Sequence, residues 1–305
     1  MRPCSQKNIE VKTMLSAELE QAKVMLATQR RQYASLPVCG ERKVINGVDC
    51  ILHLSPEKAG PVPLFLEIHG GAWVGGDAAL IDSFCKTVSD AVPCVAVNIN
   101  YTKLDVKPFP NPMEEVLKVI DYFSENCDEY RIDKGKTVLC GQSAGAHIAA
   151  GSAILLNDKY AREVSETFLI YPFLDCTGQL PNPMLNDENT KSHIQEIHKL
   201  FFGSEDVSKS YLSPAVADIE TLNGLNNTTI VTCGIDTLEP HGKTLYKKLK
   251  DNNKNTELWH YPDARHGFLE VNREDYIHDS DAKSDEQAEF ARDCEIRIIE
   301  KLREI

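Results

Sequence analysis

The sequence of 305 residues contains no apolar run of about 18 residues, the length at which a helix spans a membrane. Basic residues are in deficit, with 33 Lys and Arg against 46 Asp and Glu and a formal net charge of −13. Because phosphate groups are bound mainly by clustered Lys and Arg, this balance argues against a nucleic-acid or membrane partner. The amino terminus leads into a polar helical segment rather than the apolar centre of a signal peptide.

Metal-binding cysteine patterns are missing as well. The sequence has ten cysteines, but no Cys-x-x-Cys pair and no Cys/His spacing typical of zinc. Cys94, Cys140 and Cys233 lie in apolar runs that predict buried strands, where cysteine behaves as a small hydrophobe. Since disulfides persist mainly in oxidising compartments, we expect reduced thiols, no metal site and a cytoplasmic location.

Short apolar runs alternate with helical segments over most of the chain. Runs near 42–46 and 49–55 flank an Asn-Gly pair, a strong hairpin signal, and strands separated by helices follow. This order predicts an α/β fold with a mostly parallel eight-stranded sheet flanked by helices. The further strands are expected at 64–69, 94–99, 136–140, 167–171, 229–233 and 256–261, with helices near 79–91, 111–126, 143–157, 239–251 and 284–303.

Two segments stand outside this alternation. Residues 10–34 are rich in Leu, Ala, Glu, Lys and Gln, a helical composition. Residues 176–212 are too long for a plain connection and contain one amphipathic helix near 189–202. Because this second segment lies between two sheet strands, we interpret it as an insertion over the top of the sheet.

The pentapeptide Gly-Gln-Ser-Ala-Gly at 141–145 stands between the expected strand 136–140 and a helix rich in Ala and Gly. The Gly-x-Ser-x-Gly pattern is weak evidence by itself, but its position is informative. A sharp strand-to-helix turn lifts a serine Oγ above the sheet, and the helix directs its N–H groups at developing negative charge. We therefore predict that Ser143 is a nucleophile, against the alternative of an ordinary turn with a serine cap.

A glycine-rich loop, His-Gly-Gly-Ala-Trp at 69–73, directly follows the expected strand 64–69. Consecutive glycines let backbone N–H groups turn inward, where they stabilise the negative charge that acyl transfer places on a carbonyl oxygen. We assign this oxyanion hole to Gly70, Gly71, Ala72 and Ala144, with the N–H groups of the last three as donors. His69 ends a strand and precedes the serine, so we expect it to hold the loop by a hydrogen bond.

A second glycine pair at 75–76 suggests a phosphate-binding loop as an alternative. However, no Gly-Lys-Ser or Gly-Lys-Thr follows it, which argues against a nucleotide. We therefore expect no cofactor.

The acid and the base are sought downstream of the serine, in the order serine, acid, histidine. Asp236 follows the expected strand 229–233, at the sheet edge where parallel strands form sites, although a helix cap is its simpler role. His266 lies beyond the last strand, in reach of Ser143. His241 in a helix, His260 on a strand and His278 in an acidic surface segment fit less well. We predict Asp236 and His266 as the partners of Ser143.

Taken in order, these motifs resemble the hormone-sensitive-lipase-like branch of the α/β-hydrolases. The resemblance covers about two thirds of the chain. Its marks are the loop 69–73, Tyr101, Phe109-Pro110, the pentapeptide 141–145, Ser213-Pro214, Asp236-Thr-Leu238 and His266-Gly-Phe268.

The resemblance implies a carboxylesterase that acts on small, uncharged esters with short acyl chains. It implies a helical cap made of residues 1–40 and 176–212 over a catalytic core of 41–175 and 213–305. Trp73 resembles the aromatic residue that lines the acyl side of the pocket, though without the family it reads as a core residue. Relatives include dimers that pair edge strands, so a monomer and a homodimer both stay open.

Several positions depart from the family pattern. Ala72 stands where a third glycine is common, and the segment 100–103 lacks the typical Arg after its tyrosine. The stretch 141–147 also resembles arylformamidase-like relatives, which leaves an amidase or formamidase on the same triad as an alternative. His147, one turn into the helix, is expected to be structural. A third alternative is a non-catalytic small-molecule binder, which all three triad residues argue against.

Overall fold

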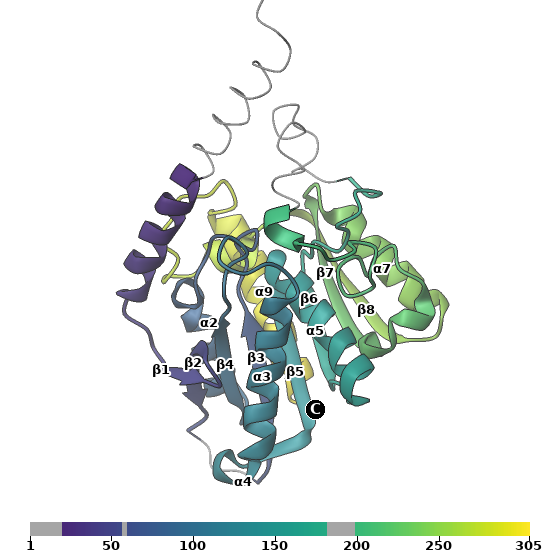
Figure 1. Cartoon of the computed structure of the whole chain (residues 1–305). Coiled ribbons are helices and arrows are strands. Elements are labelled where there is room, and N and C mark those ends of the chain that lie inside the picture. Colours follow the sequence, from purple (N-terminus) through teal and green to yellow (C-terminus); the bar gives the residue numbers. More distant parts are fainter. Residues whose placement is uncertain (1–19, 57–59, 182–198) are drawn as a thin grey trace, which may run out of the picture.

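The computed structural model describes residues 20–56, 60–181 and 199–305. Its centre is an eight-stranded sheet in the order β1-β2-β4-β3-β5-β6-β7-β8 (Figure 1). Strand β2 runs antiparallel to β1 and β4, and all other neighbours are parallel, which confirms the predicted sheet. The strands are β1 (Glu41–Ile45), β2 (Val48–Leu54), β3 (Val62–Ile68), β4 (Val95–Asn100), β5 (Ile132–Gln142), β6 (Glu166–Ile170), β7 (Asn227–Ile235) and β8 (Asn255–Arg265).

Helices cover both faces of the sheet (Figure 1). One apolar cluster joins the sheet to α3, α5 and α7, and a second joins its other face to α2 and α9. The helices are α2 (Asp82–Ala91), α3 (Asn111–Glu125), α4 (Cys127–Tyr130), α5 (Ala144–Tyr160), α7 (Glu239–Asp251), α8 (Phe268–Val271) and α9 (Asp285–Leu302), with 3₁₀ turns η1 (Ala78–Leu80), η2 (Ile219–Thr221) and η3 (Asn223–Leu225).

The central strands are apolar on both faces, as parallel strands between two helix layers must be. In β3, Leu64, Leu66 and Ile68 enter the cluster with α3 and α5, whereas Phe65 enters the cluster with α2 and α9. Side chains of a strand alternate between faces, so one continuous apolar run fills both cores.

The hairpin between β1 and β2 turns at Asn46 and Gly47, whose φ angles are 46° and 82°. Positive φ at both positions is the requirement of a type I′ turn, which explains the Asn-Gly signal. The prediction for the last strand was less accurate. Strand β8 continues past residue 261 and pairs with β7 up to Arg265. The predicted strand ended at residue 261, before Pro262, but an edge strand tolerates a proline because one side of it has no partner strand.

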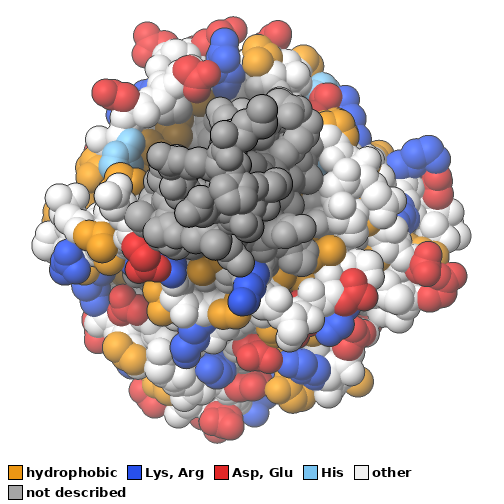
Figure 2. Space-filling view, turned by 45° about the horizontal axis from the view of Figure 1, so that its top comes forward, with side chains coloured by type: hydrophobic (Ala, Val, Ile, Leu, Met, Phe, Trp, Pro, Cys, Tyr) orange, Lys and Arg blue, Asp and Glu red, His pale blue; other side chains and the backbone are white. Residues whose placement is uncertain are grey.

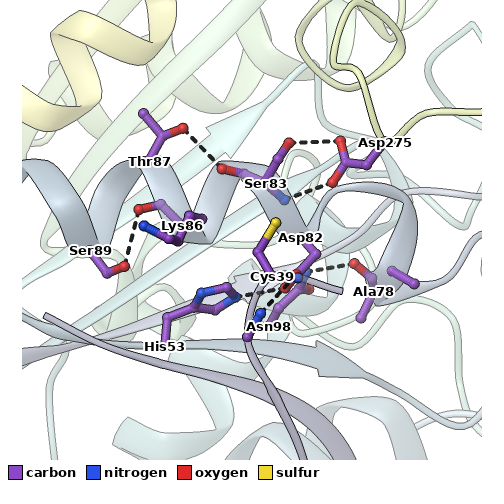
Figure 3. A network of polar contacts seen from close by, with 12 residues as sticks. Cys39, His53, Ala78, Asp82, Ser83, Lys86, Thr87, Ser89, Asn98 and Asp275 are labelled. Carbon is purple, nitrogen blue, oxygen red and sulfur yellow. Dashed lines mark hydrogen bonds and ion pairs between the residues drawn. The ribbon is translucent and has the colours of Figure 1, made fainter. Parts of the chain in front are cut away.

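Asp82, at the start of α2, fixes the segment before the hairpin to the sheet (Figure 3). One carboxylate oxygen contacts His53 Nε2 at 2.6 Å, and the other accepts hydrogen bonds from the backbone N–H groups of Cys39 and Gly40. The side chains of His53 and Asp82 are both at most 2% exposed. Ser83 continues the network to the far end of the chain, because its hydroxyl and N–H both donate to Asp275 at 2.7 Å.

The predicted cap falls only partly on the described residues. Residues 20–34 are helical, and Arg30 pairs through both guanidinium NH groups with Asp105 at 2.9 and 2.8 Å. Of the helix expected at 189–202, residues 199–202 are helical and 189–198 lie outside the described part. The division into cap and core therefore stays a prediction.

The described residues also show where the charged side chains and the cysteines lie. Figure 2 shows Lys and Arg interspersed with Asp and Glu over the coloured part of that face. The nine cysteines that the structure describes are free, and Cys94, Cys140 and Cys233 are buried as expected. Within the described ranges, no helix is both long and apolar enough to cross a bilayer.

Candidate active site

Ser143 lies at the turn between β5 and α5. Its φ of 52° and ψ of −115° are a strained conformation for a residue with a Cβ, of the kind that costs about 1–3 kcal/mol. The flanking glycines make the turn sterically feasible. A Cβ on Gly141 would lie 2.4 Å from the Gly145 carbonyl oxygen, and one on Gly145 would lie 1.9 Å from the Ile68 oxygen. The pentapeptide therefore holds the serine hydroxyl above the carboxyl end of the sheet.

Three side chains from separate parts of the chain meet at this point. His266 Nε2 lies 2.9 Å from Ser143 Oγ, and His266 Nδ1 lies 2.8 Å from Asp236 Oδ2. Ser143 and His266 are 123 residues apart in sequence, but both follow the carboxyl ends of parallel strands. Because the carboxylate only accepts hydrogen bonds, Nδ1 carries the proton and Nε2 presents a lone pair to the serine hydroxyl.

Asp236 contacts both the turn into α7 and the His266 ring, the two positions expected of a helix cap and of a histidine partner. Its Oδ1 accepts a hydrogen bond from the Leu238 N–H at 2.9 Å, which organises the turn into α7. The other oxygen, Oδ2, is the one that contacts His266. The carboxylate side chain is 3% exposed, so its negative charge acts on the imidazole with little screening by water.

The pKa of His266 is raised above its usual value of 6.5. Burial alone would lower this pKa, but the hydrogen bond and charge of Asp236, with a smaller contribution from the charge of Glu270, more than offset it. The imidazolium form is thus stabilised at the position where a general base gains its proton.

Glu270 is a site residue that the sequence analysis missed. It lies in α8, four residues after His266, and its carboxyl accepts a hydrogen bond from the Gly70 N–H. Burial raises the pKa of Glu270 to about 7, with His266 and the Gly70 N–H lowering it in part. Its spacing from the histidine was the only available signal. The Gly70 N–H is therefore already engaged within the protein.

The glycine loop after β3 has an unusual backbone. Gly71, Ala72 and Trp73 all have positive φ, at 117°, 49° and 64°. His69 donates from Nδ1 to the Gly70 carbonyl oxygen at 2.6 Å, so it does hold the loop, as expected. The glycine pair that suggested a phosphate loop has a packing role instead. A Cβ on Gly76 would lie 2.4 Å from that same Gly70 oxygen.

Trp73 is buried, with 3% of its surface exposed. Its indole makes edge-on contacts with a group of rings at centroid distances of 4.9–6.1 Å, from Phe109, His147, Phe173 and Phe201. This aromatic cluster forms a fixed wall on one side of the glycine loop.

Four other histidines within residues 60–181 and 199–305 have structural partners. His147 Nε2 donates to the Leu212 carbonyl at 2.9 Å, and burial lowers its pKa to about 4. His241 accepts from the Leu174 N–H and donates to the Pro181 carbonyl. His260 contacts the Thr232 hydroxyl, and His278 contacts the Tyr33 hydroxyl.

A small cavity of about 90 Å³ adjoins the loop on the side of Glu270. Its walls come from the glycine loop, η1, the helix 20–34 and the segment after α8, and include Gly70, Gly71, Asp77, Tyr33, Tyr276 and His278. Within the described parts of the chain, no group of three or more His, Cys, Asp or Glu side chains is arranged to hold a metal ion.

The fold and this geometry agree with comparisons to known proteins. A family model described as the alpha/beta hydrolase fold matches residues 65–270. The chain belongs to this family. The match confirms the predicted fold class and the resemblance drawn from the sequence motifs.

Named relatives of this α/β-hydrolase include esterases. It is 28% identical over 229 residues to the carboxylic ester hydrolase LipN of Mycobacterium tuberculosis, a match covering 72% of this chain and 60% of LipN. It is 25% identical over 224 residues to an acetyl esterase of Salmonella paratyphi B, covering 72% of this chain and 69% of that enzyme. The α/β-hydrolase also shares its fold with a hyperthermophilic esterase of Pyrobaculum calidifontis, at a TM-score of 0.71 and 23% identity over 96% of this chain and 91% of the other.

Proposed function

We propose that this α/β-hydrolase is a serine carboxylesterase in which Ser143, His266 and Asp236 form the catalytic triad. The observation that carries the proposal is the continuous hydrogen-bonded line from the Ser143 hydroxyl through the imidazole to the Asp236 carboxylate, at 2.9 and 2.8 Å. Both distances lie within the reach required for proton transfer to a general base.

Each member of the line has a defined task in ester cleavage. His266 Nε2 takes the Ser143 proton while Oγ attacks the ester carbonyl, and the imidazolium then protonates the departing alkoxide. A water molecule repeats the sequence on the acyl-enzyme, which releases the acid and restores the hydroxyl. Asp236 holds Nδ1 protonated throughout, so that Nε2 always faces the serine.

The oxyanion that forms at each step needs donors. We assign this role to the N–H groups of Gly71, Ala72 and Ala144, because the first two follow β3 and the third opens α5 beside Ser143. Each such donor is worth about 3 kcal/mol in related acyl transfers. Gly70 does not donate to the substrate in this assignment, because its N–H donates to Glu270. Its role is to hold the loop, since its carbonyl accepts from His69.

We further propose small, uncharged esters with short acyl chains as substrates. The relative named acetyl esterase supports a short acyl group. So does the aromatic cluster around Trp73, which packs the side of the loop assigned to the acyl chain with buried rings. A negative net charge of −13 disfavours anionic esters.

The test is a series of p-nitrophenyl esters from acetate to decanoate, with Ser143→Ala as the control. We expect kcat/KM to be highest for acetate to butyrate and the Ser143→Ala rate to fall to the background level. Full activity of Ser143→Ala would refute the triad. No ester turnover together with cleavage of N-formylkynurenine would establish the formamidase alternative instead.

A further inference from the structure

Lys103 lies buried directly behind the glycine loop, where a lysine is rare. Its side chain is 3% exposed, and its Nζ has three acceptors: His69 Nε2 at 2.8 Å, Asn100 Oδ1 at 3.0 Å and the Tyr101 carbonyl at 3.0 Å. Burial lowers the pKa of Lys103 to about 7, so near neutral pH the side chain is present both as an amine and as an ammonium. In the ammonium form each of its three donors has an acceptor. The Nζ also lies 4.0 Å from the centroid of the Tyr101 ring, a cation–π contact.

The Gly70 carbonyl, 2.6 Å from His69 Nδ1, decides where the imidazole proton is. Because a carbonyl oxygen only accepts, the ring proton is on Nδ1, and Nε2 presents its lone pair to a donor N–H of Lys103 Nζ at 2.8 Å. Burial, together with the charge of Lys103, lowers the pKa of His69 well below its usual value, so the ring stays neutral. Nδ1–H is then the donor to the Gly70 carbonyl at 2.6 Å. The His69 ring is held flat against Tyr101, with centroids 4.5 Å apart and planes at 17°.

The Gly70 carbonyl belongs to the same peptide plane as the Gly71 N–H. In a trans peptide these two groups point in opposite directions, and the plane is rigid. Fixing the carbonyl oxygen on the His69 side therefore fixes the Gly71 N–H toward the opposite side. That N–H is a proposed donor for the substrate oxyanion.

We propose that Lys103 is a positioning residue for the oxyanion hole: through the Nδ1–H form of His69 it orients the peptide plane that aims the Gly71 N–H at the reacting carbonyl. The hydrogen bonds of Lys103 go to His69, Asn100 and Tyr101 and not to a triad residue. The family motif does not include Lys103, because the chain departs from the typical pattern in the segment 100–103. The proposal rests on the esterase function of Ser143.

The first test compares Lys103→Met with Lys103→Gln. Methionine fills the buried space of the lysine stem but donates no hydrogen bond, whereas the glutamine amide retains a donor for His69 Nε2. We expect Lys103→Met to lower kcat about 30-fold with KM within about threefold, since misaiming one donor costs less than its complete loss of about 10²–10³-fold. Lys103→Gln should recover most of that loss. The matched control is Lys248→Met, since Lys248 is a half-buried lysine whose Nζ also donates to a carbonyl, that of Ala217, outside the site.

A double-mutant cycle separates positioning from a general structural effect. In His69→Asn the side-chain amide takes over the Nδ1–H donor role toward Gly70 without a need for Lys103. We therefore expect Lys103→Met to lower kcat by less than about threefold in the His69→Asn background. An equal loss in both backgrounds would overturn the proposal, as would a Lys103→Met variant with unchanged kcat.

Two further measurements cover the remaining outcomes. If Lys103→Met does not fold, Lys103→Gln and the ¹⁵N shifts of His69 decide the matter. The wild type and Lys103→Gln should both show a protonated Nδ1 at His69, and a protonated Nε2 in the wild type would refute the proposal. Because Ser143→Ala tests the triad independently, an inert Lys103 leaves the esterase proposal intact, whereas an active Ser143→Ala removes both.

Discussion

Replacing Asp236 by Asn removes one negative charge from the site while keeping the shape of the side chain. The asparagine carbonyl oxygen can still accept from the Leu238 N–H, the bond that organises the turn into α7 at 2.9 Å. Its amide then faces His266 Nδ1, where the carboxylate now lies at 2.8 Å. An amide N–H donates, so Nδ1 must become an acceptor and the ring proton moves to Nε2. The imidazole then points an N–H at Ser143 and cannot take its proton.

The expected loss follows from this change of tautomer. In serine hydrolases a wrong tautomer with intact geometry costs about 10⁴ in kcat, which corresponds to about 5 kcal/mol in the activation barrier. Stability should change by less than about 1 kcal/mol, because Asn caps turns about as well as Asp. A large kinetic effect with a small thermal one is the signature of a catalytic rather than a capping carboxylate.

The assay is steady-state hydrolysis of p-nitrophenyl acetate at about pH 8, combined with thermal unfolding. Asp263→Asn serves as the control, because it makes the same chemical change three residues before His266 on an exposed side chain. If Asp236→Asn retains more than about one tenth of the wild-type kcat, the carboxylate acts only as the cap of the turn, and the triad assignment is wrong.

Three other outcomes follow from the structure. Because the pKa of His266 is raised by Asp236 and Glu270, and only the neutral ring accepts a proton, kcat/KM should fall as the pH drops through a value above 6.5. Glu270→Gln should move this acidic limb of the pH–rate profile to lower pH. An unchanged acidic limb would exclude an effect of the Glu270 charge on His266. Gly76→Ala places a Cβ 2.4 Å from the Gly70 oxygen and should lower kcat about 10²-fold, whereas Gly60→Ala, with open space around the Cβ, should leave kcat unchanged. Equal kcat values for the two variants would show that the glycine loop adapts to the added Cβ. Asp82→Ala should lower the free energy of unfolding by about 3 kcal/mol in urea titrations, because the buried His53 imidazole and the N–H groups of Cys39 and Gly40 lose their hydrogen-bond partner. A loss below about 1 kcal/mol would show that these hydrogen bonds do not stabilise the fold.

Local patterns carried most of the prediction. The short apolar runs and the Asn46-Gly47 turn predicted all eight strands, because strand and hairpin geometry depend on neighbouring residues. The predicted end of the last strand, at residue 261, was wrong because it depends on the topology of the sheet and not on neighbouring residues. Whether a proline is tolerated depends on which strand is at the edge of the sheet, and that is a property of the topology.

The sequence by itself determined the chemistry of the candidate site: a serine between glycines at a strand-to-helix turn, a glycine loop after β3, and an acid and a histidine after later strands. The structure places these residues together because the carboxyl ends of parallel strands share one edge, so residues at strand ends are brought together by the fold class alone. Only the tertiary structure decided the hydrogen-bond partners, the tautomers and the burial. The sequence analysis assigned no role to Lys103 or Glu270, and Lys and Glu are rarely buried. Their roles depend on contacts with Nε2 of His69 and with the Gly70 N–H, and such contacts between distant residues exist only once the strands have been packed side by side.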